Sequence, residues 1–355
     1  MKIIYYVTAH GYGHGVRTCA IVNELPPDTE VVFRTVLPES FFREEVRRRF
    51  IYAPASFDCG CIQKDGITAD IPATLNAYAR IAEQNESRFA DEVAWCRDQE
   101  PSLIASDIVP LAFDVAKACG IPSVAATNFT WYDIYAPYCR DIPGYQPLLA
   151  GLREQYASAS LLLALDPAML MDYFPVRAAI GPVARKGTSR RSEIVRHYGI
   201  EPGHHIGLLY VGQGGVDGFD AAALERFSGW EFLGVSPIGH APANCRLIDK
   251  ADFPYQDLAA SADCMIGKLG YSAVAEAMVH GTPMIYLPRE DFAEYAALDA
   301  AVRTWGGGAA LSAEEFLQCT WESALNRCIL LPRPAPVHAG GARQAAAYMV
   351  NLAGA

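Results

Sequence analysis

The stretch that most constrains the fold of this chain is a turn between an apolar run and a helical one. Residues 264–267 are apolar or small and predict a buried strand, and residues 277–279 continue a helical pattern. Between them lies Lys268-Leu-Gly-Tyr-Ser-Ala-Val-Ala-Glu276, which carries a cation, a hydroxyl and a carboxylate. A strand that stops at glycine and restarts as a helix points backbone N–H groups outward, where they can bind an anion such as a diphosphate. The sequence therefore predicts an anion-binding turn in an α/β fold.

The N-terminal part of the chain predicts a parallel sheet. Apolar runs over Ile3–Val7, Val31–Val36 and Ile51–Ala53 are typical of buried strands. Helical patterns lie between them, one beginning near Val16 and one over Phe41–Phe50. This βαβαβ order is the start of a doubly wound parallel sheet.

A second α/β pattern follows a basic stretch. We interpret Pro182–Ser192 as a linker whose charges are solvated. Strands are predicted over Ile206–Val211 and Met284–Leu287, with a long helix over Ala313–Arg327. No short-period repeat is visible, and we predict two α/β halves joined by this linker. The assigned domains are residues 1–184 for the first Rossmann-like domain, 185–335 for the second, and 336–355 for a final helical segment.

Composition and charge exclude several classes of function. The 355 residues are 51% hydrophobic and 19% charged, which indicates an ordered globular protein, and the net charge of −11 disfavours binding to nucleic acid or anionic lipid. The N-terminal apolar run is too short for a secretory signal, and no run approaches the roughly 18 to 20 residues of a membrane span. We therefore expect a cytoplasmic protein without a transmembrane segment. Ten scattered cysteines, with only the pair Cys59-Gly-Cys61 close together, predict reduced thiols and no metal site.

Two histidines and an aspartate are candidates for acid–base chemistry. His10 and His14 lie in the glycine-rich loop after the first strand, and Asp107 follows the predicted strand Leu103–Ser106. A histidine that is hydrogen-bonded to a carboxylate can deprotonate a hydroxyl group. The alternative for each histidine is a loop residue bonded to backbone, and for Asp107 an ordinary strand end or helix cap.

Aromatic residues gather after the predicted strand Ser123–Ala126. We interpret Thr127–Tyr145 as an irregular segment, which either forms a wall for a ligand or packs beneath a long loop. Its aromatic residues are Phe129, Trp131, Tyr132, Tyr135, Tyr138 and Tyr145.

The second half offers weaker signals around the predicted turn. The glycines of Gly212-Gln-Gly-Gly215 either approach a phosphate or form a tight turn. Lys268 is flanked by apolar residues, so an anion from a ligand or from the protein should meet it. Glu276 could accept hydrogen bonds from ribose hydroxyls, or it could simply face solvent.

These motifs resemble a known family. Lys268 to Glu276 is similar to the donor signature His-Cys-Gly-Trp-Asn-Ser-Thr-Leu-Glu of inverting GT-B glycosyltransferases, in the UDP-glycosyltransferase and glycogen phosphorylase-like superfamily. The Gly-His pair at Gly13 and His14 resembles the same enzymes and the peptidoglycan GlcNAc transferase. Asp107 resembles the aspartate that orients their histidine. The loop from His10 to His14 and the Gly-Lys-Leu-Gly-Tyr motif also resemble the N-terminal, transferase-like domain of arabinose kinases.

The resemblance implies a fold and a reaction. The fold would be GT-B, with two facing Rossmann-like domains, a cleft between them and a final helix that returns to the first domain. The first domain would bind the acceptor and the second a nucleoside-diphosphate sugar, UDP-linked. The sugar would move to an acceptor hydroxyl with inversion, without metal and with no cofactor besides the nucleotide-sugar co-substrate. His14 would be the general base and Asp107 its orienting partner.

The resemblance also assigns binding residues by position. On the donor side it implies Gly212, Gln213, Gly214, Gly215, Phe253, Lys268, Gly270, Tyr271, Ser272, Glu276, Glu290, Asp291 and Glu294. On the acceptor side the candidates are His10, Gly11, Gly13, Asn128, Trp131 and Tyr132.

Two departures from the family pattern leave questions open. Lys268 replaces a histidine, and the usual acidic-Gln pair after Pro288 is absent, so the donor sugar is not specified. The acceptor, whether a small molecule, a glycan or a lipid-linked sugar, is also open. The rival interpretations are a nucleotide-sugar epimerase or hydrolase, and a GT-B protein that binds sugar or nucleotide without catalysis.

Overall fold

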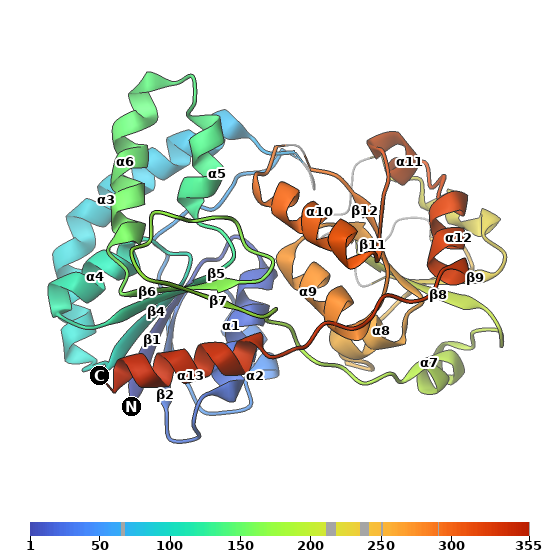
Figure 1. The fold of residues 1–355 in the computed structure, drawn as a ribbon, viewed down its shortest axis with the longest axis horizontal. Coiled ribbons are helices and arrows are strands. Elements are labelled where there is room, and N and C mark those ends of the chain that lie inside the picture. Colours follow the sequence, from blue (N-terminus) through green and yellow to red (C-terminus); the bar gives the residue numbers. More distant parts are fainter. Residues whose placement is uncertain (65–67, 211–217, 235–240, 250, 290, 355) are drawn as a thin grey trace. The chain divides into compact units, whose positions relative to one another are not determined.

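The chain divides into two compact units. The computed structural model describes residues 1–64, 68–210, 218–234, 241–249, 251–289 and 291–354. Unit 1 comprises Met1–Ile62, Ala69–Ala184 and Ala339–Ala355, and unit 2 comprises Gln63–Thr68 and Arg185–His338. Each unit contains one parallel sheet with helices packed against it (Figure 1).

The sheet of unit 1 has seven strands in the order β3-β2-β1-β4-β5-β6-β7. Every pair of neighbours is parallel. The central strands are buried along almost their whole length, which explains their continuous apolar sequence. The strands are β1 (Lys2–Val7), β2 (Glu30–Arg34), β3 (Ile51–Ala53), β4 (Leu103–Asp107), β5 (Ser123–Thr127), β6 (Leu161–Leu165) and β7 (Arg177–Ile180).

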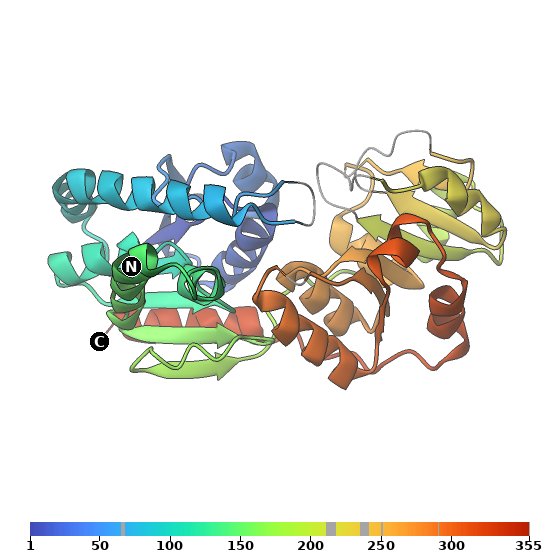
Figure 2. The ribbon, with the colours of Figure 1, turned by 90° about the horizontal axis from the view of Figure 1, so that it is seen from above.

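Helices cover both faces of this sheet. One group of contacts joins α1, α2 and α13, and another joins α3, α4 and α6, on the other side of the strands in Figure 1. Figure 2 shows the long helix α3, in light blue, along its whole length. The helices are α1 (Tyr12–Glu24), α2 (Glu39–Glu45), α3 (Ile71–Asp98), α4 (Leu111–Cys119), α5 (Trp131–Tyr138), α6 (Gln146–Ala157) and α13 (Gly341–Ala353), with a short 3₁₀ turn η1 at Pro143–Tyr145.

The last helix belongs to unit 1, although it follows unit 2 in the sequence. Helix α13 packs against α1 and contacts β4 and β7. Its residues Ala345, Ala346 and Met349 are buried, and Gln344 Oε1 accepts a hydrogen bond from the backbone N–H of Gly181 at 2.9 Å. Unit 1 is therefore built from both ends of the chain.

Unit 2 contains a parallel sheet of six strands in the order β10-β9-β8-β11-β12-β13. Its strands are β8 (His205–Tyr210), β9 (Trp230–Gly234), β10 (Cys245–Leu247), β11 (Cys264–Lys268), β12 (Met284–Leu287) and β13 (Gly308–Ala310). Its helices are α7 (Arg191–Tyr198), α8 (Tyr255–Ser261), α9 (Tyr271–His280), α10 (Glu294–Trp305), α11 (Ala313–Leu317) and α12 (Glu322–Leu330), with a 3₁₀ helix η2 at Ala221–Arg226.

The turn predicted from the sequence joins β11 to α9 in the centre of unit 2. Strand β11 lies between β8 and β12, and a side chain at Gly267 would collide with the backbone of β8, since its Cβ would lie 2.1 Å from the carbonyl oxygen of Tyr210. Glycine is therefore required by close backbone approach. Gly270 is the N-cap of α9 and has extended backbone. The predicted strand, turn and helix are thus present.

Several elements differ from the sequence prediction. The segment that we interpreted as irregular contains helix α5, which begins with a capping box between Thr130 and Asp133. The predicted helix Phe41–Phe50 ends at Glu45, and the predicted helix Ala313–Arg327 is two helices, α11 and α12. Strands β7 and β13 and helix α6 were not predicted. Each edge strand has four residues or fewer, which is too short for a periodic signal.

The basic linker also differs from the prediction of a solvated hinge. Arg185 pairs with Glu276, Arg190 pairs with Glu193, and Arg191 pairs with Asp263. Arg191 in addition begins helix α7. Three of the four cations of this segment are therefore paired with carboxylates within unit 2. None of the helices that the structure describes combines the length and apolar character needed to cross a bilayer.

Candidate active site

The carboxyl ends of β1 and β4 bring together His14 and Asp107. The two strands are neighbours, and Val7 lies opposite Asp107 in the register. After β1 the chain turns at Gly11, the N-cap of α1, which places His14 in the first turn of that helix. His14 Nδ1 lies 2.9 Å from Asp107 Oδ1, and both residues are buried. The structure thus places the two predicted catalytic residues in direct contact.

A third residue, Arg17, completes this cluster. It lies one turn after His14 on α1 and is 2% exposed. Its Nε and Nη2 donate to the two carboxylate oxygens of Asp107, each at 2.5 Å. Nη2 also lies 3.0 Å from His14 Nδ1 and 3.1 Å from the Thr127 hydroxyl, and Nη1 donates to the side-chain oxygen of Asn128. The carboxylate that holds the histidine is therefore held by an arginine.

This arrangement keeps the aspartate ionised and the histidine neutral. Burial opposes ionisation of Asp107, but Arg17 and His14 together hold its pKa below the usual value. The pKa of His14 is lowered chiefly by burial, with Arg17 acting in the same direction and Asp107 in the opposite one. A neutral imidazole next to a carboxylate can accept a proton from a hydroxyl group.

The loop after β3 forms a wall beside the two histidines. The backbone N–H of Cys61 donates to His10 Nδ1 at 3.1 Å. Gly60 has φ of +65°, and a Cβ there would lie 2.5 Å from the same nitrogen, so only glycine lets the loop approach the ring. Asp58 accepts hydrogen bonds from Trp131 Nε1 at 2.8 Å and from the Thr8 hydroxyl at 3.0 Å. Burial raises the pKa of Asp58 to about 6, although both hydrogen bonds act against this.

Two of the predicted acceptor residues lie behind the site and not on its surface. Trp131 and Asn128 are fully buried. The Trp131 ring packs 5.1 Å from His10 and 6.4 Å from His14, measured between ring centroids. The aromatic segment was interpreted either as a ligand wall or as packing beneath a loop, and the buried ring of Trp131 fits the second interpretation. Gly11 and Gly13, also predicted on the acceptor side, lie in the turn that begins α1.

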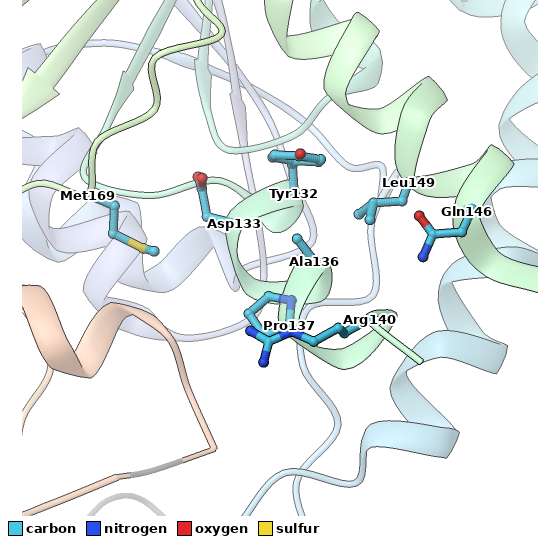
Figure 3. Close-up of a pocket in the computed structure, with 8 residues that line it drawn as sticks. All are labelled: Tyr132, Asp133, Ala136, Pro137, Arg140, Gln146, Leu149 and Met169. Carbon is cyan, nitrogen blue, oxygen red and sulfur yellow. The ribbon is translucent and has the colours of Figure 1, made fainter. Parts of the chain in front are cut away.

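Tyr132 lies elsewhere, at a hollow of about 500 Å³ on unit 1. Figure 3 shows Tyr132 and Ala136 on α5, Leu149 and Gln146 on α6, and Met169 on the loop after β6. An aromatic ring, an arginine and an amide around an open hollow suit a polar ring-containing molecule. The residues that line the hollow are Tyr132, Asp133, Ala136, Pro137, Arg140, Gln146, Leu149 and Met169.

In unit 2, one cation lies at the turn between β11 and α9, and a second lies after the neighbouring strand β12. Lys268 ends β11 and lies opposite Leu287 of β12, two residues before Arg289. Burial lowers the pKa of the Lys268 ammonium, and the nearby Arg289 lowers it further. Gly270, Tyr271 and Ser272 form the N-cap and first turn of α9 beside them. A cation at the start of a helix, with a second cation close to it, suits a diphosphate.

Glu276 differs from its expected environment. It is 1% exposed, and its Oε1 accepts a hydrogen bond from Arg185 Nε at 2.7 Å. The interpretation of a solvent-facing helix residue is therefore wrong. A ribose hydroxyl could bind this oxygen only if Arg185 moved or shared it.

The other predicted donor residues are spread over unit 2. Phe253 is buried against His197, Tyr198 and Arg190, so its ring is not presented to a base. Glu294 is buried at the start of α10. Asp291 Oδ1 lies 3.8 Å from Arg289 Nη2. Gly212, Gln213, Gly214, Gly215 and Glu290 lie outside the described residues. The described residues also contain no group of three or more His, Cys, Asp or Glu that could hold a metal ion.

Comparison with solved structures places this architecture among known folds. The chain aligns over 99% of its length with 98% of a kitacinnamycin glycotransferase, at 15% identity and a TM-score of 0.63. It aligns over its full length with 96% of the spinosyn rhamnosyltransferase SpnG, at 14% identity and a TM-score of 0.64. It covers 94% of Phytolacca americana UGT2, at 13% identity and a TM-score of 0.63. The chain has the GT-B fold.

The GT-B fold predicted from the sequence is thus confirmed. No protein-family model matches the chain. Among curated proteins, L-arabinokinase of Arabidopsis thaliana is 30% identical over 346 residues, which are 95% of this chain and 32% of that protein. The chain therefore spans about a third of the length of this relative.

Within this GT-B chain, the sequence did not indicate three residues that the structure brings to the candidate sites. Arg17 could have been found as a charged residue three positions after His14, at helical spacing from it on α1. Arg289 follows a predicted strand end, which is a weak signal. Arg185 lies far from Glu276 in the sequence, and nothing local predicts that they pair.

Proposed function

We propose that the protein is a glycosyltransferase that moves a sugar from a UDP-linked donor to an acceptor hydroxyl, with inversion at the anomeric carbon. The observation that carries the proposal is the 2.9 Å contact between His14 and the buried Asp107, at the carboxyl ends of β1 and β4 in a GT-B fold. Ligands of open parallel sheets bind at this edge. The likeness to glycosyltransferase structures supports the same reaction class.

In the proposed reaction, His14 is the general base. As the acceptor oxygen attacks the anomeric carbon, its proton passes to His14 Nε2. The bond from that carbon to the diphosphate oxygen breaks, and its electron pair leaves with the diphosphate. Asp107 stabilises the imidazolium that forms, as an ionised partner of a catalytic histidine does.

The donor diphosphate would bind at the N-terminus of α9. Lys268 and Arg289 would neutralise charge that develops on the leaving group, and the backbone N–H groups of the first turn would add to this effect. Since these residues supply the positive charge, we propose that transfer needs neither a metal nor another cofactor. The reaction would take place in the cytoplasm.

The donor and acceptor classes rest on the solved relatives. The Phytolacca americana enzyme was solved with UDP-2-fluoro-glucose and pterostilbene. A UDP-sugar and a hydroxylated aromatic acceptor are therefore the first pair to test with this chain.

One observation favours a second candidate, a protein that binds a sugar or nucleotide without transferring it. Oε1 of Glu276, the expected ribose ligand, already accepts a hydrogen bond from Arg185 Nε at 2.7 Å in the described structure. The curated relative is moreover named a kinase and is only partly covered by this chain.

The test is an assay of the purified chain with a panel of UDP-sugars and hydroxylated acceptors, with products identified by mass spectrometry and the anomeric configuration by NMR. The proposal predicts an inverted glycoside in the presence of EDTA. Release of free or epimerised sugar without acceptor would show a hydrolase or epimerase instead. Binding of UDP-sugar with no product across the panel would favour the second candidate.

A further inference from the structure

A groove of about 990 Å³ lies on unit 1 among helices α3, α4 and α6. Contacts join α3 to α4 and α4 to α6, and Figure 1 shows the three helices on one side of the strands. The volume is near the upper end of the roughly 300–1,000 Å³ that small-molecule sites have. None of the residues that line the groove belongs to the cluster around His14 and Asp107. The groove is therefore separate from the candidate active site.

The lining of this groove is largely apolar. Leu111 at the start of α4 and Leu152 on α6 are buried, and Phe89 on α3 is half-buried. Gly151 lines the groove from α6, and a Cβ at this position would meet nothing within 4 Å. The groove is thus open space between apolar side chains, which suits the ring of a small molecule.

Two oxygens in this lining lack a hydrogen-bond partner in the part of the chain that the structure describes. Tyr78 is 4% exposed, and its hydroxyl has no such partner. Asp114 Oδ2 accepts a hydrogen bond from Gln155 Nε2 at 2.6 Å, whereas Asp114 Oδ1 accepts none. Neither oxygen is among the fully enclosed atoms without a partner, so both reach the groove. A side chain as buried as Tyr78 normally has its polar atom paired, and a bound molecule would supply the partner.

An amide in the same lining shows the usual arrangement. Asn85 is buried on α3, and its Nδ2 donates to the carbonyl oxygen of Phe57 at 2.9 Å. Its Oδ1 accepts a hydrogen bond from Arg88 Nε at 3.1 Å. The polar atoms of Asn85 therefore serve the fold, and those of Tyr78 and Asp114 remain for a ligand.

The charges near Asp114 show that its two oxygens differ in what surrounds them. Burial raises the pKa of Asp114, and the hydrogen bond from Gln155 and the charge of Lys117 act in the opposite direction. Lys117 is exposed, and the described structure contains no ion pair between its ammonium and Asp114. Asp114 also contributes to the raised pKa of Tyr78, after the larger effects of burial and Asp58. The Tyr78 hydroxyl and the Asp114 carboxylate therefore lie near each other.

The two oxygens select the polar group of a ligand. A carboxylate only accepts hydrogen bonds, whereas the Tyr78 hydroxyl has a hydrogen to donate. A ligand ammonium would only donate and would leave that hydrogen unpaired, and a ligand carboxylate would only accept and would be repelled by Asp114. A ligand hydroxyl donates one hydrogen bond and accepts another, so it suits both oxygens.

We propose that this groove is a second ligand site, which binds an uncharged ring compound through one hydroxyl group. The ring packs on Leu111 and Leu152, and the hydroxyl donates to Asp114 Oδ1 and accepts from Tyr78. This site does not depend on the proposed transfer reaction.

The test is a titration of the full chain with 2-naphthol, followed by NMR of the methyl groups of Leu111 and Leu152. Both signals should shift in a saturable way. The comparison compounds are 2-methoxynaphthalene, which cannot donate, the ammonium form of 2-naphthylmethylamine, which cannot accept, and 2-naphthoate, which is an anion. Each should bind roughly 10-fold or more weakly, since each loses a hydrogen bond that 2-naphthol makes. Equal affinity for 2-naphthol and 2-methoxynaphthalene would overturn the proposal.

Tyr78→Phe separates binding from folding. Because the Tyr78 hydroxyl has no described protein partner, this variant should keep the urea midpoint of wild type and bind 2-naphthol more weakly. Tyr156→Phe is the matched control, since the Tyr156 hydroxyl donates to the carbonyl oxygen of Ile108 at 2.6 Å and its loss should lower the midpoint. Asp114→Asn should also weaken 2-naphthol and should reduce the discrimination against 2-naphthoate. Unchanged affinities in Tyr78→Phe and Asp114→Asn would contradict the roles of these oxygens.

A third variant fills the groove without touching its polar atoms. Gly151→Leu places a side chain in the open space and improves helix propensity, so it should fold normally and abolish the shifts. Ala150→Leu is the control, because Ala150 is exposed on the same helix and does not line the groove. Undiminished binding in Gly151→Leu would place the probe elsewhere and overturn the proposal.

One arm distinguishes this site from an acceptor site, because hydroxylated aromatic compounds are also the acceptors to be tested for transfer. His14→Ala should leave the affinity measured at Leu111 and Leu152 unchanged. A loss of affinity in this variant would place the probe at the candidate active site and contradict a second site. The titration needs no donor sugar, so absence of transfer would contradict the proposed function alone.

Discussion

At the scale of single residues, the candidate active site depends on buried charged side chains that form ion pairs with one another. His14 receives a carboxylate from a neighbouring strand and a guanidinium from its own helix. Asp58, in the wall beside it, has hydrogen-bond donors but no cation among its described contacts. As pH rises, the contribution of Asp107 to folding stability therefore increases and that of Asp58 decreases, because the pKa of Asp107 is lowered and the pKa of Asp58 is raised.

The lowered pKa of His14 predicts the acidic limit of activity. A general base works only when it is unprotonated, so the rate falls as pH drops through its pKa. Because burial and Arg17 place this pKa below the ordinary value of about 6.5, the acidic limb of kcat/KM should have its midpoint below that value. A pH–rate profile measures it, and a midpoint above 6.5 would contradict the described environment of His14.

The raised pKa of Asp58 predicts a pH-dependent cost in stability. The pKa of Asp58 is about 6 in the folded state and about 3.9 in the unfolded state. Between these two pH values the folded state therefore binds more protons than the unfolded state. The contribution of Asp58 to stability falls as pH rises from the lower value to the higher one. Asp58→Asn removes the titration. The free energy of unfolding of this variant relative to wild type should rise by about 2 kcal/mol from pH 4 to pH 7.

Urea denaturation at the two pH values measures this difference. Asp98→Asn is the control, because that carboxylate is exposed at the end of α3. Equal differences at both pH values for Asp58→Asn would show that Asp58 does not titrate as described.

At the scale of elements, strand β11 and the turn that follows it contain two glycines with different roles. Gly267 meets the backbone of β8, whereas a Cβ at Gly270 would meet nothing within 4 Å. Gly270 has φ of −140°, which any residue adopts. Substitutions at these two glycines therefore test stability and ligand binding separately.

The prediction is that Gly267→Ala destabilises the protein and Gly270→Ala does not. Forcing a methyl group against a carbonyl oxygen in the sheet should cost about 1–3 kcal/mol or more. Gly270→Ala should fold normally but bind UDP more weakly, since the methyl group lies where the proposed diphosphate approaches. Denaturation and calorimetric titration with UDP measure the two effects. Normal stability in Gly267→Ala would contradict the packing of β11 against β8.

The elements also show what the sequence could predict. Strands such as β1 and β4 are continuous apolar runs, so their positions and the order of the first half followed from the sequence. The pairing of His14 with Asp107 was implied by the motif resemblance, and both residues were placed after predicted strands. Helix α5 was missed because aromatic residues are weak helix formers. Its capping box joins residues only three positions apart, so this signal could have been read from the sequence. Arg17 and Arg185 were missed because their partners are distant in the sequence, and only folding brings them together.

At the scale of the whole molecule, unit 1 is completed by the end of the chain. Helix α13 packs on α1, the helix that carries His14 and Arg17. Met349 is fully buried in this contact region. The stability of the candidate catalytic cluster should therefore depend on residues more than 300 positions away.

This architecture predicts how unit 1 can be isolated. Residues 1–184 alone should be unstable, because they lack α13 and expose the face of α1 that it covers. The same residues joined to 339–355 through a flexible linker should fold cooperatively. Circular dichroism during thermal unfolding compares the two proteins. Equal, cooperative unfolding of both would contradict the role of α13.

The central claim is that His14 is the base of a sugar transfer. The most direct measurement is the turnover of His14→Ala with a UDP-sugar and an acceptor that the wild type uses, beside His197→Ala as a control for an exposed histidine in unit 2. Loss of a general base predicts that kcat falls about 10²- to 10⁴-fold while affinity for UDP is unchanged. The control should retain wild-type turnover. Full turnover in His14→Ala would contradict the account.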